Sequence, residues 1–292
     1  MILSASSIPR ICQRSCVAVD LNTLLASQFV LPSIPKVVAL LLSELGRSEP
    51  DLKTITQLIS TDPALTTRLL QTANAGFFKL SGKINSVSEA LAILGLAHVR
   101  AMAAQAASAA SLKAVPGINL QQFWAYSLNV AKLSRSLAGV VRQNPQAAFT
   151  CGLIHAVGEL AMHIGMPDEV AALDREVDPL DLRRARLEHR SFGFCYAEVG
   201  AGFASKWQFP QPIVDALAHQ YAPFQDEVYE PLAGVIHLAT WRVRAREGGL
   251  SANALAVTFP GAVGEVLGLD IDIVLQQDPI DWSAQMPGRS LI

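Results

Sequence analysis

Residues that start and stop helices recur along this chain at intervals of about one helix length. Ser33 stands shortly before Pro35, Asp62 stands directly before Pro63, and Ser86 begins a segment of the same kind. An oxygen-bearing side chain at such a place caps unpaired backbone N–H groups, and proline is tolerated in the first helical turn. Apolar residues follow each start at helical spacing, which leaves little room for strands. The pattern predicts an all-α fold.

Turn residues predict how the helices are divided. Pro116-Gly117 follows an alanine-rich segment and is typical of a turn between two lobes. Gly95 predicts a break or a close helix contact within the preceding helical region. No period of 20–50 residues repeats, so the chain is not expected to be a solenoid. We predict an N-terminal tail, a helical first lobe, a helical second lobe, and a helical C-terminal extension with its own tail, over residues 1–20, 21–116, 117–246 and 247–292.

Composition and charge argue against several classes of partner. The chain has 292 residues, of which 51% are hydrophobic and 16% charged, with a formal net charge of -2. Because there is no basic excess to neutralise phosphates, we expect no nucleic acid. The apolar stretch nearest to membrane-span length, residues 91–115, contains charged and polar interruptions, so we expect no membrane insertion. The opening residues lack the features of a secretory leader, which predicts a cytoplasmic protein.

The four cysteines predict reduced thiols. Cys12 and Cys16 have no second pair at zinc-ribbon spacing. Cys151 and His155 lie four residues apart on one predicted helical face, which leaves open a soft-metal site completed by Cys195 or His219. The simpler interpretation is that His155 is a hydrogen-bonded core residue and that the helical cysteines are small buried apolar groups.

Several short motifs, taken in order and with their spacing, resemble one family. They are residues 31–35 (LPSIP), 62–66 (DPALT), 73–75 (ANA), 90–95 (ALAILG), 123–127 (FWAYS), 152–158 (GLIHAVG), 197–201 (AEVGA) and 207–210 (WQFP). Together they resemble the HDOD family, the HD-related output domains, over residues 31–223. The resemblance implies a two-lobed helical fold, in which a helical first lobe packs on an HD-like second lobe, and a place in bacterial signal transduction.

The same resemblance implies where a metal site would lie. Catalytic HD relatives hold a divalent ion with a His, a His-Asp pair and a later Asp, and the ion activates water against a phosphate ester. The positions that the resemblance assigns to this region are Tyr126, His155, Ala156, Tyr196, His219 and Thr240. A histidine alone does not bind a hard divalent ion, because the negative charge of carboxylate ligands is needed to offset the free-energy cost of dehydrating the ion. We therefore expect a vestigial, non-catalytic site with no metal and no cofactor, partly filled by the two tyrosines.

A run of arginines is the second candidate site. Arg183, Arg184, Arg186 and Arg190 follow one another closely, with Glu188 between them. Such a run is usually a solvated helix face. It is also the best local candidate for contact with an acidic partner or a nucleotide phosphate. We expect the side chains of Arg183 and Arg184 to be exposed and unnecessary for the fold.

Two classes of function follow from these observations. The first is a non-catalytic regulatory module that binds a signalling protein, with the cleft between the two lobes as the contact surface. The alternative is a metal-dependent phosphohydrolase or phosphodiesterase with an altered ligand set. A third interpretation treats the vestigial pocket as a nucleotide sensor without turnover. The sequence identifies neither the partner, nor the input signal, nor the oligomeric state.

Overall fold

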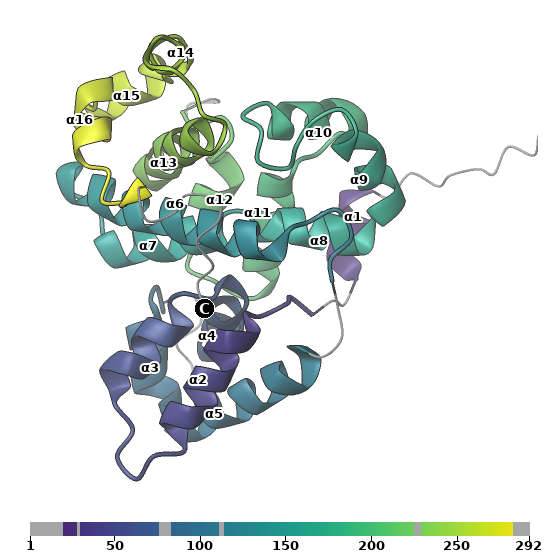
Figure 1. The fold of residues 1–292 in the computed structure, drawn as a ribbon, viewed down its shortest axis with the longest axis vertical. Coiled ribbons are helices and arrows are strands. Elements are labelled where there is room, and N and C mark those ends of the chain that lie inside the picture. The colour runs from purple at the N-terminus through teal and green to yellow at the C-terminus, as the bar shows by residue number, and fades with distance from the viewer. Residues whose placement is uncertain (1–19, 28–29, 76–82, 111–113, 225–228, 283–292) are drawn as a thin grey trace, which may run out of the picture.

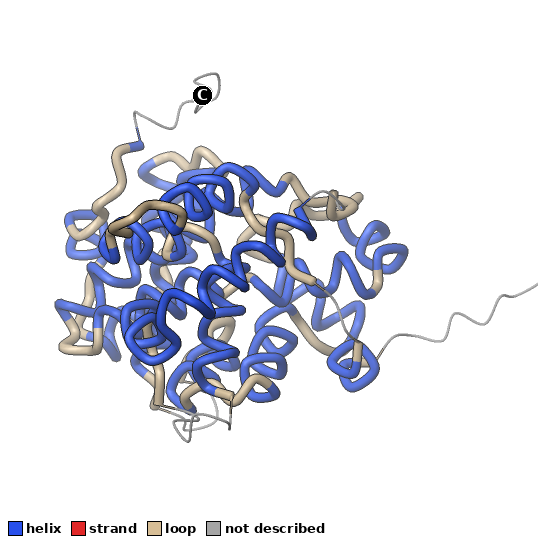
Figure 2. Tube along the Cα trace, turned by 90° about the horizontal axis from the view of Figure 1, so that it is seen from below, coloured by secondary structure: helices blue, strands red, loops and turns tan. Residues whose placement is uncertain are grey.

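The structure is a computed structural model that describes residues 20–27, 30–75, 83–110, 114–224 and 229–282. Over these ranges every extended regular element is a helix and no strand is present, as Figure 2 shows. The predicted all-α fold is confirmed. The cysteines near the start of the chain, Cys12 and Cys16, lie outside the described residues.

The helices form two groups (Figure 1), and one large cluster of buried apolar residues extends through both. In the smaller group, which consists of α2 to α5, helix α5 packs against α2 and α4. The larger group lies above it and consists of α6, α7, α8, α11, α12 and α13. Helices α15 and α16 pack on α13. In chain order the helices are α1 Leu21–Ala26, α2 Pro35–Leu45, α3 Leu52–Ile59, α4 Pro63–Asn74, α5 Val87–Ala110, α6 Leu120–Val140, α7 Pro145–Ile154, α8 Val157–Gly165, α9 Pro167–Asp174, α10 Arg184–Phe192, α11 Tyr196–Lys206, α12 Gln211–His219, α13 Pro231–Glu247, α14 Ala252–Thr258, α15 Gly261–Leu267 and α16 Ile271–Gln276.

Helix α1 differs from the predicted division of the chain. The prediction placed it at the start of the first lobe, but α1 packs against α8 and α11 in the larger group. Leu24 is buried there, and a Cβ atom added to Gly165 would overlap its side chain. The Lys206 ammonium also donates to the carbonyl oxygen of Leu25 at 2.6 Å. Tertiary contact with a distant helix therefore decides where this short segment lies, and the remaining lobe boundaries stay predictions.

Asp62 connects the starts of two helices. Its carboxylate accepts hydrogen bonds from the N–H groups of Ala64 and Leu65, which caps α4. The same carboxylate accepts from the N–H of Ile34 at 2.6 Å, at the start of α2. Ile34 is the N-cap residue of α2, and the buried Ser33 hydroxyl has no hydrogen-bond partner. The expectation that Ser33 caps this helix is therefore wrong, because the distant carboxylate takes over the role.

The burial of Asp62 makes stability depend on pH. Burial raises its pKa from 3.8 to about 6, against the opposing effect of the three N–H donors. An acid whose pKa is raised by folding contributes stability that is complete below its unfolded pKa and is lost as the pH rises through the folded value. We expect this contribution to decline between about pH 4 and pH 6, by up to roughly 3 kcal/mol.

Denaturant unfolding of the wild type and of Asp62→Asn across this pH range measures the contribution. Asparagine keeps the ability to cap α4 but does not titrate, so the difference in unfolding free energy between the two chains should change in that window. A difference that stays constant from pH 4 to pH 7 would contradict the assignment.

Gly95 divides α5 into two segments. Its backbone has a φ of 70° and a ψ of 171°, a conformation that residues with a Cβ atom rarely adopt. The predicted break at Gly95 is confirmed. The second segment of α5 continues past the break, and residues of this segment and of α4 line a groove described below.

Two segments have the length and hydropathy of a membrane span, although the sequence was expected to contain none. Pro145–Gly165 contains α7 and α8, and 89% of its apolar 18-residue window is buried inside the protein. Val87–Ser108 belongs to α5 and is 33% buried. One or two such helices are weak evidence for a membrane, and the cellular location stays a prediction.

Candidate functional site

Tyr126 on α6 and His155 at the end of α7 form the centre of the larger helical group. The Nδ1 atom of His155 lies 2.7 Å from the carbonyl oxygen of Gly152, so this nitrogen carries the proton and donates. The Nε2 atom then accepts from the hydroxyl of Tyr126 at 3.0 Å. Both ring nitrogens are therefore engaged within the protein.

His155 is poorly suited to hold a metal ion in this arrangement. It is fully buried, and burial lowers its pKa to about 3, so the ring is neutral at physiological pH. A neutral imidazole is a good ligand only where a lone pair is available, and here the Nε2 lone pair receives the Tyr126 hydroxyl. The position next to it is Ala156, which is buried and provides no ligand atom.

Arg244 on α13 brings a positive charge into this centre, and the sequence analysis did not identify it. Its Nε atom donates to the Tyr126 hydroxyl at 2.9 Å, and its Nη1 atom donates to the carbonyl oxygen of Asp181 at 3.0 Å. The guanidinium carbon lies 5.7 Å from the ring centroid of Tyr126 and 5.5 Å from that of Tyr196. These contacts are of the cation–π kind.

The charge on Arg244 is retained despite its burial. Burial alone would lower its pKa, but the phenol groups of Tyr126 and Tyr196 and the carboxylate of Glu159 raise it above the ordinary value. A permanent cation therefore lies among the positions that the sequence assigns to a metal site. These residues do not fit a divalent ion, because the carboxylate ligands are missing and the guanidinium would repel it.

Most of the predicted site residues come together around Arg244. Tyr126 and His155 bind each other, Tyr196 lies against the guanidinium, and Thr240 lies one helical turn before Arg244 on α13. Tyr196, Thr240 and Arg244 line a cavity of about 320 Å³. The structure therefore places Tyr126, His155, Tyr196 and Thr240 close to Arg244, and the vestigial nature of the site stays a prediction.

His219 does not line this cavity, although the sequence analysis assigned it to the site. Its neighbour Gln220 lines the cavity and donates through Nε2 to the carbonyl oxygen of His155 at 3.0 Å. His237 also lines the cavity, with its Nδ1 atom 2.8 Å from the carbonyl oxygen of Gln220. Adjacent residues at the end of a helix point in directions about 100° apart, so an alignment error of one residue replaces one side chain by the other.

The arginine run is divided between the interior and the surface. Arg183 is 70% exposed, whereas the side chain of Arg184 is completely buried, so the prediction that Arg184 is exposed is wrong. Glu188 is buried as well. Arg184 and Glu188 lie four residues apart on the inward face of α10, while Arg186 and Arg190 lie on its exposed face.

Arg184 is surrounded by three carboxylates. It is 2.8 Å from Glu188, 2.7 Å from Asp174 and 3.0 Å from Glu159, although this last ion pair lacks hydrogen-bond geometry. Burial raises the pKa of both Glu159 and Glu188, while the charge of Arg184 opposes that rise. Glu188 also accepts from the backbone N–H of Tyr196 at 2.8 Å. This cluster of Arg184, Glu159, Asp174 and Glu188, the buried ion cluster, therefore holds the start of α11 against α10.

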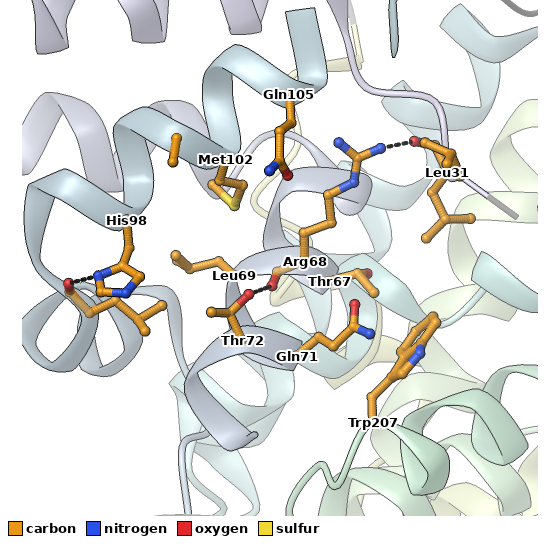
Figure 3. A pocket seen from close by; sticks show the side chains of 13 residues that line it. Leu31, Thr67, Arg68, Leu69, Gln71, Thr72, His98, Met102, Gln105 and Trp207 are labelled. Atoms are coloured by element: carbon orange, nitrogen blue, oxygen red, sulfur yellow. Dashed lines mark hydrogen bonds between the residues drawn. The ribbon is translucent and has the colours of Figure 1, made fainter. Parts of the chain in front are cut away.

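A second cavity lies between the two helical groups and is shown in Figure 3. Its volume is about 510 Å³, and we call it the α4–α5 groove. Arg68 points along it and donates to the carbonyl oxygen of Leu31 at 2.8 Å, while Trp207 closes one end from the larger group. The lining residues are Val30, Leu31, Thr67, Arg68, Leu69, Gln71, Thr72, Leu94, His98, Ala101, Met102, Gln105 and Trp207. Among these described residues there is no carboxylate.

Solved structures with the same fold include a response regulator, MmoQ, from Methylococcus capsulatus (strain Bath). It is 26% identical to this chain, with a TM-score of 0.68, and the match covers 86% of this chain and 98% of that one. A virulence factor from Campylobacter jejuni is 16% identical, with a TM-score of 0.62, covering 88% of this chain and 96% of that one, and shows the fold alone.

Comparison of sequences adds a relative and a family. An uncharacterized protein of Treponema pallidum (strain Nichols) is 25% identical over 228 residues, or 75% of this chain, but the match spans only 43% of that relative's length. The sequence pattern of the HDOD domain matches residues 31–223, which is more than half of the chain. With the helical fold and the ordered motifs, this match shows that the chain belongs to the HDOD family.

Proposed function

We propose that this protein is a non-catalytic regulatory module that acts in bacterial signal transduction by binding a partner protein. The observation that carries the proposal is the guanidinium of Arg244, hydrogen-bonded to Tyr126 and placed beside a neutral His155. A similar solved structure is named a response regulator, which supports a signalling role.

Hydrolysis of a phosphate ester at this centre would need a divalent ion to activate water. Carboxylate ligands supply the charge that holds such an ion, and the corresponding positions here are Ala156 and Thr240. Arg244 already supplies a positive charge to the same place. The centre therefore serves to hold α6, α11 and α13 together rather than to turn over a substrate.

The α4–α5 groove is the surface we propose for the partner. Its lining combines apolar groups such as Met102 and Trp207 with the guanidinium of Arg68, and none of the described lining residues is acidic. Methionine adapts to different apolar surfaces, and the Arg68 guanidinium, which already interacts with the buried Asp62, can also pair with a carboxylate of the partner. The partner that fits is an amphipathic protein segment with an acidic residue placed opposite Arg68.

The same alanine-to-arginine change at two positions of α5 tests this surface. Ala101 and Ala104 are both exposed on the same helix, but only Ala101 lines the groove. We expect Ala101→Arg to lose the partner in affinity purification from the native host, and Ala104→Arg to retain it. Equal recovery of the same partner by both variants would contradict a role for the groove.

The cavity beside Arg244 supports a second candidate, a ligand sensor without turnover. Arg244 and Tyr221 contribute donor groups to the lining of this cavity of about 320 Å³, which suits an anionic small molecule such as a nucleotide. Titration with nucleotides and cyclic dinucleotides, followed by calorimetry, tests this candidate. Saturable binding that Thr240→Trp abolishes without loss of fold would support it, and absence of heat at millimolar ligand would contradict it.

A further inference from the structure

A second, independent group of metal-ligating side chains lies where α10 meets α11. His189, Cys195 and Glu198 offer one imidazole nitrogen, one sulfur and one carboxylate oxygen, and these atoms lie within 4.8 Å of one another. No other residues that the structure describes form such a group of three. None of the three belongs to the positions that the family resemblance assigns to the vestigial centre.

The backbone holds these three side chains together. Gly193, with a φ of 81°, ends α10 and turns the chain, so that Cys195 becomes the N-cap residue of α11. The Cys195 sulfur accepts from the N–H of Glu198, while the Glu198 carboxylate accepts from the N–H of Cys195 at 2.8 Å. This reciprocal capping fixes the ligand atoms of Cys195 and Glu198 relative to each other.

His189 completes the group from the last turn of α10. Its Nε2 atom lies 2.9 Å from the Glu198 carboxylate, and its ring stacks on Tyr221 at a centroid distance of 5.9 Å. The side chains of His189 and Glu198 are 39% and 36% exposed, whereas Cys195 is buried beneath them. An ion from solution can therefore reach the oxygen and nitrogen ligands first and then the sulfur.

We propose that His189, Cys195 and Glu198 bind one zinc ion, with the fourth position left to solvent. One nitrogen, one sulfur and one oxygen ligand match the donor set that zinc accepts, and zinc tolerates a tetrahedral site with one open position. Ligand atoms around a tetrahedral zinc lie roughly 3–4 Å apart, so the present spacing needs only a small contraction. The ion would lie between His189 and Glu198, in place of their direct contact at 2.9 Å.

Zinc binding here has a defined proton balance. A thiol with the ordinary pKa of about 8.5 carries its proton at neutral pH before an ion binds. Formation of the zinc–sulfur bond expels that proton to the buffer, and no oxidation or reduction takes place. The measured binding enthalpy should therefore depend on the ionisation enthalpy of the buffer.

The bound ion would act on the helix that supports the buried ion cluster. His189 directly follows Glu188, which binds Arg184 and the N–H of Tyr196. Zinc would join the end of α10 to the start of α11 on the exposed side, opposite to that cluster. We expect the midpoint of thermal unfolding to rise with zinc concentration.

Calorimetry of Zn²⁺ binding to the metal-stripped full chain tests the proposal. The wild type should bind one zinc ion, and Cys195→Ser and His189→Gln should each weaken binding by about tenfold or more. Serine is a favourable N-cap residue, so Cys195→Ser should keep the fold and its thermal midpoint without zinc. Substitution by Co²⁺ should give a sulfur-to-metal charge-transfer band in the wild type that is absent in Cys195→Ser.

A control separates this site from the other thiols of the chain. Replacement of both Cys12 and Cys16 by serine leaves the proposed ligands intact, and zinc affinity should be unchanged. The proposal is overturned if the wild type binds no zinc at micromolar concentration. It is also overturned if Cys195→Ser and His189→Gln bind zinc as tightly as the wild type.

Discussion

Replacement of Arg184 by methionine is expected to lower the free energy of unfolding by about 3–5 kcal/mol. Methionine keeps much of the side-chain length but removes the charge that lies between Glu159, Asp174 and Glu188. The cost arises because buried carboxylates lose their counter-ion and must take up protons. The loss should therefore be smaller at acidic pH, where protonation of the carboxylates is cheaper.

Arg183→Met is the matched control, since Arg183 precedes Arg184 in the chain but is largely exposed. Its pairing with Asp181 takes place in water, where such a pair contributes little to stability. Urea unfolding followed by circular dichroism measures both variants. Equal stability of the two variants would show that Arg184 is not the buried partner of the three carboxylates.

Replacement of Gly158 by alanine is expected to prevent folding or to cost at least about 3 kcal/mol. A Cβ atom at this position would overlap the carbonyl oxygen of Tyr196 and would lie 2.7 Å from the backbone nitrogen of Gly200. Both obstacles are backbone atoms, so no side chain can move away to relieve the contact. Helix α8 packs closely on α11 because Gly158 has no side chain. The same packing places Tyr196 beside Arg244.

Gly139→Ala is a control that is not expected to lower the stability of the protein. Gly139 lies within α6, and a Cβ atom there would meet nothing within 4 Å. Because Gly139 lies in the last turn of α6, alanine there should leave the stability unchanged or raise it by up to about 1 kcal/mol. Thermal unfolding of the two variants distinguishes a packing effect from a general effect of glycine replacement. A Gly158→Ala protein that unfolds at or above the wild-type temperature would contradict the close α8–α11 contact.

Helix positions could be predicted from the sequence because their signals are local. Asp51 and Asp62 cap α3 and α4 through N–H groups two and three residues away, and Gly95 breaks α5 through its own backbone. Where the partner is distant, the same reasoning fails. The N–H of Ile34 is bound by Asp62, 28 residues later, so the local interpretation of Ser33 was wrong.

The candidate site could be predicted in part for a similar reason. The positions of Tyr126, His155 and Thr240 came from a family resemblance, and the structure brings them together. Arg244 was missed because α13 carries alternating arginines, and only tertiary packing decides which one points inward. Its bond to Tyr126 joins residues 118 positions apart. The burial of the Arg184 side chain likewise depends on the orientation of the short helix α10, and the order of charged residues in the sequence does not determine that orientation.

The central claim is that Arg244 replaces the metal ion at this HDOD centre and that the centre does not catalyse. The direct test is Mn²⁺ binding by electron paramagnetic resonance, combined with hydrolysis of bis(p-nitrophenyl) phosphate and of a cyclic dinucleotide. We predict no Mn²⁺ held at His155 and no turnover above that of the His155→Ala protein. One Mn²⁺ bound per chain, with turnover that His155→Ala abolishes and Cys195→Ser preserves, would contradict the account.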